Sequence, residues 1–277
     1  MSDGLGFPRL ATVLPELMAF VSGQAASYRD GELDAWEALA ARTHAFFTAA
    51  RMERVEALVP GWREMSGYGE GVTLVHTMCA LIGLLNSPEY RRASVVQQAQ
   101  IEWVLLLHDL AKWVREDERD YAHPFRAAAM AGAILPRLGF PVTGAYSAGY
   151  ETWAALACDA VIFRREEEKT LHICDNRRLP EIVDGIARLY GPDTPAALIV
   201  QAILLHTSVT VLQAWPQAAP LTADEERRYL TPALLPLLKM MMLADNDGWE
   251  LFNAETQAAF RAETLAVFER LEAALQT

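Results

Sequence analysis

Apolar residues recur every three or four positions along almost the whole chain, with polar residues between them. This spacing gathers apolar side chains on one face of a helix. Alternating runs of β-branched residues, which would indicate strands, do not stand out. The pattern therefore predicts helices rather than strands. The predicted helices cover residues 10–27, 33–58, 72–85, 95–114, 124–138, 196–214, 232–246 and 255–275.

One long segment, residues 141–195, interrupts this pattern. It contains several glycine and proline residues, which break helices, and a run of charged residues at 164–169. We expect an insertion of short helices there, lying over one end of the core. The chain shows no internal repeat and no linker-like stretch. It is therefore predicted to fold as one all-α domain over residues 1–277.

Composition and charge narrow the classes of partner. The chain has 277 residues, of which 52% are hydrophobic and 22% charged, as is ordinary for a soluble globular protein with a sizeable core. Its net charge of −12 argues against binding to nucleic acid, whose phosphate backbone requires a basic surface. Small phosphorylated ligands are not excluded, because a bound metal ion reverses the local field.

Cysteine usage and hydropathy bear on the compartment. The three cysteines are odd in number and scattered, which fits a reducing cytosol better than a disulfide framework. The N-terminal residues lack the basic region and apolar run of a signal peptide. The longest apolar run, residues 196–212, is interrupted by polar residues such as Gln201 and His206. We expect a cytoplasmic protein that has no membrane partner.

The most unusual stretch is the strongly apolar one over residues 101–113, which contains the pair His108 and Asp109. An imidazole and a carboxylate inside an apolar helix are unfavourable unless a partner satisfies them. A metal ion is a common partner for both groups at once. A single His-Asp dipeptide also arises by chance, so the interpretation depends on other residues that complete a site.

His76 and Asp245 lie on apolar helix faces in the same way. His76 shares its face with Cys79, three residues later, and Asp245 follows Met241 by four residues. A hydrogen-bonded core histidine is the alternative interpretation for His76, and a structural salt bridge for Asp245. Asp247, two residues further on, is assigned to a turn at 246–248 that ends the helix.

Three more residues are candidates for the same site. His206 lies deep in the least polar predicted helix, and His123 takes the N-cap position before Pro124, where the helix dipole favours a neutral imidazole. Lys112 follows Asp109 by three residues and leans over the same face. The alternatives are a core histidine, a capping histidine and a solvent-exposed lysine. The remaining histidines are expected at the surface: His44 and His172.

In chain order, His76, the pair His108-Asp109 and Asp245 resemble the H…HD…D signature of the HD-domain superfamily of metal-dependent phosphohydrolases. The sequence HDLAK, ending at Lys112, is similar to the family's HD-x-x-K helix. The resemblance covers about residues 72–248. It implies an HD-domain-like helical bundle, in which residues 141–195 form an irregular helical insertion.

The resemblance also implies a set of metal ligands. His76, His108, Asp109 and Asp245 would hold a divalent metal ion. Some members bind a second ion through extra histidines between the HD pair and the last aspartate. His123 and His206 are in similar positions, so that Asp109 would bridge two ions. Manganese, iron, cobalt, nickel, zinc and magnesium suit such ligands to different degrees, and the spacing does not choose among them.

The function that the resemblance implies is hydrolysis of a small phosphorylated metabolite or nucleotide by a metal-activated water. Asp109 and Lys112 would be catalytic, and Lys112 and Arg126 would bind the substrate's phosphate group. One alternative is a di-iron oxygenase, since relatives of the superfamily use a similar site. Another is a non-catalytic HD domain that binds a nucleotide.

Overall fold

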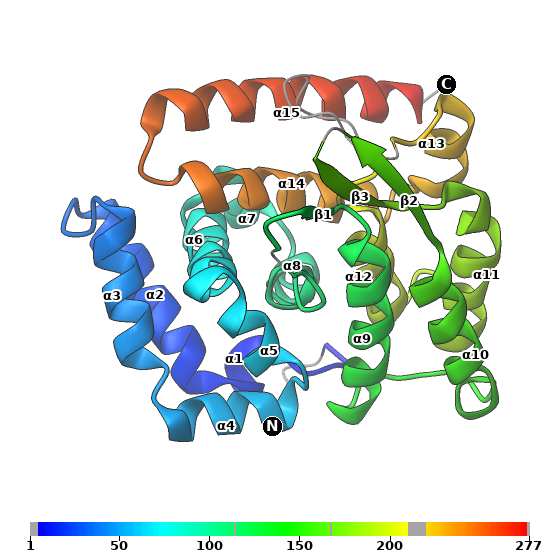
Figure 1. The fold of residues 1–277 in the computed structure, drawn as a ribbon, viewed down its shortest axis with the longest axis horizontal. Helices are drawn as coiled ribbons and strands as arrows, with labels where there is room; N and C mark the ends of the chain where they lie inside the picture. The colour runs from blue at the N-terminus through cyan, green and yellow to red at the C-terminus, as the bar shows by residue number, and fades with distance from the viewer. Residues whose placement is uncertain (1–4, 114, 167, 210–219, 276–277) are drawn as a thin grey trace.

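Helix α8 (Val95–Leu107) lies at the centre of the molecule and is seen end-on in Figure 1. The structure, a computed structural model, describes residues 5–113, 115–166, 168–209 and 220–275. A capping box begins α8, because the Ser94 side chain accepts from the backbone N–H of Gln97, whose side chain accepts from that of Ser94. Every residue from Ala99 to Leu107 is buried.

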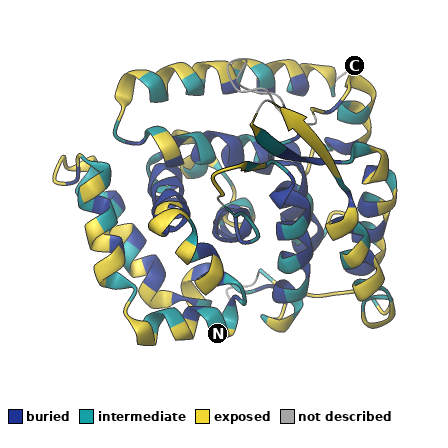
Figure 2. Cartoon of the chain, viewed as in Figure 1, coloured by how far each residue is buried: buried dark blue, intermediate teal, exposed yellow. Residues whose placement is uncertain are grey.

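Three further helices surround α8: α6 (Val72–Asn86), α12 (Pro195–Leu205) and α14 (Leu235–Glu250). The sequences of α6 and α12 are apolar on almost every side, which is typical of helices with neighbours all round. Figure 2 shows these central helices mostly in dark blue, with exposed residues gathered at the periphery. The predicted all-α fold is confirmed.

An outer layer of helices covers this central group. Helix α9 (His123–Arg137) packs against α12, α15 (Ala254–Ala274) against α14, and α2 (Pro15–Arg29) against α6. The other helical elements are α1 (Leu10–Val13), α3 (Trp36–Phe46), α4 (Ala49–Leu58), α5 (Trp62–Gly67), η1 (Tyr68–Gly71), α7 (Pro88–Arg92), α10 (Tyr146–Asp159), η2 (Asn176–Arg178), α11 (Leu179–Tyr190) and α13 (Ala223–Tyr229).

A small three-stranded sheet was not expected from the sequence. Its central strand β3 (Lys169–Cys174) pairs with β2 (Val161–Glu166) in antiparallel register and with β1 (Glu118–Asp120) in parallel register. Strand β2 is largely exposed and the second half of β3 is buried, so neither strand shows alternation. Residues 141–195 therefore contain a β-hairpin at their charged run, and their helices α10 and α11, of 14 and 12 residues, are as long as core helices α8 and α12 rather than short as predicted.

Two predicted helices are each divided in the structure. The first is interrupted at Leu14, because the following Pro15 disfavours helical backbone at the residue before it. The second is interrupted at Thr48, whose side chain accepts a hydrogen bond from the backbone N–H of Arg51 and begins α4. Apolar spacing continues across both breaks, so it could not reveal them.

Three predicted helix boundaries near the polar residues were also wrong. Helix α8 ends at Leu107, so the pair at 108–109 lies in the turn that follows. Helix α12 ends at Leu205 with His206 as its C-cap, and residues 210–214 of the predicted helix lie outside the described part. Helix α9 begins at His123 itself, with Ala122 as its N-cap.

Helix α14 continues through the predicted turn at 246–248. Gly248 is not a C-cap glycine. A Cβ atom there would lie 2.5 Å from Cε1 of His76, so glycine is needed for close packing on α6. The assignment of Asp247 to a turn was wrong, because it is buried against Gly83 of α6 and accepts a hydrogen bond of 2.8 Å from Gln257.

One stretch, Trp62–Asn86, is long and apolar enough to cross a membrane by composition, and 72% of its most apolar window is buried in the fold. It is not one straight helix. The chain bends at residues 69–71, where Gly69, Glu70 and Gly71 all adopt left-handed φ values. These properties fit a core helix of the domain, and the cytoplasmic location stays a prediction.

Candidate metal centre

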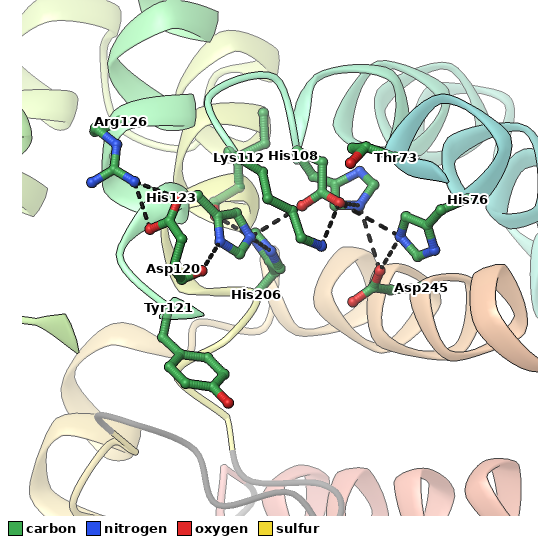
Figure 3. A network of polar contacts seen from close by, with 12 residues as sticks. Thr73, His76, His108, Lys112, Asp120, Tyr121, His123, Arg126, His206 and Asp245 are labelled. Atoms are coloured by element: carbon green, nitrogen blue, oxygen red, sulfur yellow. Dashed lines mark hydrogen bonds and ion pairs between the residues drawn. The ribbon is translucent and has the colours of Figure 1, made fainter. Parts of the chain in front are cut away.

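The polar residues singled out in the sequence converge between α6, α8, α12 and α14 (Figure 3). The first group consists of His76, His108 and Asp109, whose nearest ligand atoms all lie within 4.8 Å of one another. Asp245 adjoins this group, with Oδ1 2.9 Å from Nε2 of His76 and 3.4 Å from Nε2 of His108. All but Asp245, which is 23% exposed, are buried almost completely.

The second group consists of Asp109, His123 and His206, which are likewise buried and within 4.8 Å of one another. The two groups share Asp109, which offers a different oxygen to each. Oδ2 lies 3.6 Å from Nε2 of His76 and of His108, whereas Oδ1 lies 3.1 Å from Nε2 of His123. Bonds of about 2.1 Å to one ion would separate neighbouring ligands by roughly 3.0–3.5 Å, close to these distances.

Three of the histidines have the same local support. Nδ1 of His108, His123 and His206 lies 2.7–2.8 Å from the backbone carbonyl three residues earlier. For His108 and His206 this carbonyl belongs to the last turn of a helix, where carbonyl groups lack helical partners. A carbonyl can only accept, so Nδ1 carries the proton and Nε2 presents its lone pair to the centre. This arrangement is the usual support of metal-binding histidines.

The lone pairs of these imidazole nitrogens point towards the space between the ligands, where a cation would bind. Nε2 of His108 is buried and has no hydrogen-bond partner in the described part of the chain, although it faces two carboxylates. Nε2 of His123 and Nε2 of His206 face each other at 3.2 Å. Electron pairs directed at one another or at carboxylates repel, and a cation between them removes the repulsion. The donor set therefore fits one or two divalent metal ions.

The pKa values of the buried groups in this centre depend on one another. Burial lowers the pKa of His206 to about 3, and His123 adds to the shift, so the ring is neutral. Burial opposes ionisation of Asp109, but Lys112 and His108 hold its pKa well below its usual range. Burial also opposes ionisation of Asp245, but His108 and His76 hold its pKa well below its usual range. In return, and against the effect of burial, Asp109 and Asp245 raise the pKa of His108, so a proton on His108 offsets carboxylate charge that a metal ion would neutralise in its place. Neutral imidazoles and ionised carboxylates are the forms that bind metal ions.

The two predicted substrate-binding cations differ in their surroundings. Nζ of Lys112 lies 2.7 Å from Oδ2 of Asp109, beside the centre, and its side chain is 21% exposed. Although burial opposes it, Asp109 raises the pKa of Lys112, so the amine is charged. Arg126 instead points away from the first group, with one guanidinium nitrogen 2.5 and 2.6 Å from the Asp120 carboxylate (Figure 3). Its contact with a substrate stays a prediction.

Asp120 is a supporting residue that sequence reasoning missed. It lies in β1 within a run of charged residues, yet its side chain is only 1% exposed. Its carboxylate holds Arg126 and accepts from the backbone N–H of Ala122, while its carbonyl accepts from Nδ1 of His123. The strand pairing that buries Asp120 joins distant parts of the chain, and the charged run around it gave no sign of this.

The two histidines predicted at the surface have different outcomes. His44 is exposed, as predicted. The prediction for His172 was wrong, because β3 carries it between β1 and β2, where it is 7% exposed and 3.5 Å from a carboxylate oxygen of Glu118. Neither belongs to the metal centre.

Comparison with known proteins adds no relative to this picture. No family model matches the chain, and no curated protein and no solved structure matches it significantly.

Proposed function

We propose that this protein is a metal-dependent phosphohydrolase of the HD-domain type, acting on a small phosphorylated metabolite or nucleotide. The observation that carries the proposal is the position of Asp109. Its two carboxylate oxygens face two separate groups of buried histidines, as a residue that bridges two ions would. The order of the ligands along the chain, from His76 to Asp245, supports the same assignment.

Bound divalent ions would lower the pKa of a water and offset negative charge on the phosphoryl oxygens. The protein's own residues then have distinct roles. His76, His108, Asp109 and Asp245 would hold one ion, and Asp109, His123 and His206 the other. The ammonium group of Lys112 would bind a phosphoryl oxygen and stabilise the charge that develops on it. Since its side chain is partly exposed, Lys112 could contact a bound substrate while its amine stays close to the Asp109 carboxylate.

Asp109→Ala tests this proposal. Native protein should contain divalent metal by elemental analysis and release inorganic phosphate from phosphate monoesters, and both should be lost in the variant. Asp159→Ala, which removes an exposed carboxylate, is the control that should keep both. Full metal content in Asp109→Ala would contradict the site, whereas metal binding without phosphate release from any ester or nucleotide would contradict the reaction.

The shared carboxylate also favours one other reaction, because di-iron oxygenases need two neighbouring ions. Iron at two ions per chain, together with substrate-dependent oxygen uptake, would identify that activity. Nucleotide binding without turnover, measured by calorimetry on metal-loaded protein, would instead identify a non-catalytic domain. Phosphate release that depends on added metal distinguishes the proposed function from both.

A further inference from the structure

His76 lacks the support that the other three histidines of the centre share. Its Nδ1 is buried and has no hydrogen-bond partner in the part of the chain that the structure describes. The carbonyl three residues earlier, that of Thr73, lies inside α6 and already accepts a hydrogen bond of 2.9 Å from Oγ1 of Thr77. Because His76 lies in the middle of α6, it has no free backbone carbonyl of the kind that orients a histidine at the end of a helix.

The indole of Trp249 contacts the imidazole of His76 instead of a backbone carbonyl. Its ring stacks on the imidazole of His76, with centroids 4.2 Å apart and planes within 23° of parallel. The preceding residue, Gly248, brings the backbone of α14 against the same imidazole, since a Cβ atom there would lie 2.6 Å from Nδ1. Two consecutive residues of α14 therefore confine the ring, while Asp245 faces its Nε2.

Trp249 is itself held in place, although it is 46% exposed. Its ring lies within 8° of parallel to that of Trp36 in α3, with centroids 6.3 Å apart. Nζ of Lys112 lies over the Trp249 ring, 5.4 Å from its centroid. The Trp249 ring thus joins α3 to two residues of the candidate centre, His76 and Lys112.

We infer that Trp249 is a positioning residue that orients the imidazole of His76 for metal binding, in place of a hydrogen bond to Nδ1. The inference rests on the proposed metal centre. Stacking fixes the plane of the ring, and the contact with α14 fixes its depth, so that Nε2 stays directed at Asp109 and Asp245. Loss of the indole would leave the ring free to rotate, and the first group would bind its ion more weakly.

The test is a titration of metal-free protein with Co²⁺, followed by its visible absorption and by calorimetry. Trp249→Ala should weaken binding of one ion about 10-fold or more, as loss of a support to a metal-binding histidine does. Trp249→Phe keeps a stacking ring and should restore most of the affinity. Phe163→Ala removes another exposed aromatic ring, 66% exposed on β2, and should bind Co²⁺ like native protein.

Unchanged Co²⁺ affinity and spectrum in Trp249→Ala would overturn the inference while leaving the metal centre intact. A raised KM for a phosphate ester, with unchanged metal affinity, would likewise overturn it and make Trp249 a substrate contact. Failure of native protein to bind Co²⁺ would overturn the metal centre itself and the inference with it. Thermal unfolding of each metal-free variant shows whether weaker binding arises from a general loss of structure.

Discussion

Lys112 and Lys239 have equally exposed side chains that each pair with a carboxylate, but they lie in different parts of the molecule. Each side chain is 21% exposed and each amine pairs with a carboxylate, at 2.7 Å from Asp109 and 2.9 Å from Glu272 respectively. Only Lys112 lies beside the metal centre. The two lysines match in exposure and in pairing distance and differ in location, so Lys239 is a suitable control for the proposed catalytic role of Lys112.

For the proposed phosphohydrolase, Lys112→Met should lower kcat/KM for phosphate release by about 100-fold or more, because the variant would lack the cation proposed to stabilise charge on the phosphoryl group. Metal content should stay the same, since Lys112 is not a ligand. Steady-state kinetics and elemental analysis measure the two effects. Lys239→Met should leave both unchanged, and an equal loss of activity in the two variants would contradict the role of Lys112.

His206 gives metal-free protein a defined sensitivity to acid. Its pKa is lowered by burial to about 3 in the folded protein, compared with 6.5 for an ordinary histidine. As the pH falls from about 6.5 towards 3, the unfolded chain binds a proton at this residue that the folded chain does not, so stability decreases. Thermal unfolding at pH 7.5 and pH 5 should show a larger decrease in Tm for native protein than for His206→Gln. Equal decreases would contradict the buried, neutral state.

At the scale of elements, the ends of helices determine how the centre is built. Helices α8 and α12 both stop one residue before a histidine, and the free carbonyl groups of their last turns orient that histidine. Helix α14 contributes in the opposite way, by continuing past its predicted end and placing Gly248 against His76. The close approach of α14 to α6 therefore depends on glycine.

Gly248→Ala should destabilise the protein by about 1–3 kcal/mol, because a Cβ atom would overlap the His76 ring and force the two helices apart. Gly23 is the matched control, since it also lies inside a helix and a Cβ atom there would meet nothing within 4 Å. Gly23→Ala should stabilise by about 0.5–1 kcal/mol. Urea unfolding measures both, and equal effects of the two substitutions would contradict the packing argument.

The sequence alone was sufficient to identify the polar residues that interrupt apolar helix faces. His76, His206 and Asp245 each occupy a position that the helical pattern assigns to the interior, and the structure brings them together. Helix ends were not predictable in the same way, because apolar residues continue beyond them. Asp120 and Trp249 gave no signal, since one depends on strand pairing across the chain and the other is an apolar residue at an exposed position.

At the scale of the whole molecule, metal binding should stabilise the fold, because the complete ligand set exists only in the folded state. Metal at 100 times its dissociation constant would contribute about 2.7 kcal/mol. For a chain of this size that corresponds to a rise in Tm of several degrees. Differential scanning fluorimetry after chelation and reloading measures the shift. Asp109→Ala should show no shift, and an unchanged Tm in reloaded native protein would contradict the centre.

The candidate ligands are spread widely along the chain: Asp245 lies 169 positions after His76, and His206 lies 83 positions after His123. During synthesis, the first histidine leaves the ribosome long before the last aspartate exists. An ion therefore cannot guide early folding, in contrast to small zinc domains whose ligands are close together in sequence. In the proposed centre the apolar helices would assemble first, and metal insertion would be a late step of maturation that depends on which ions the cell has available at that moment.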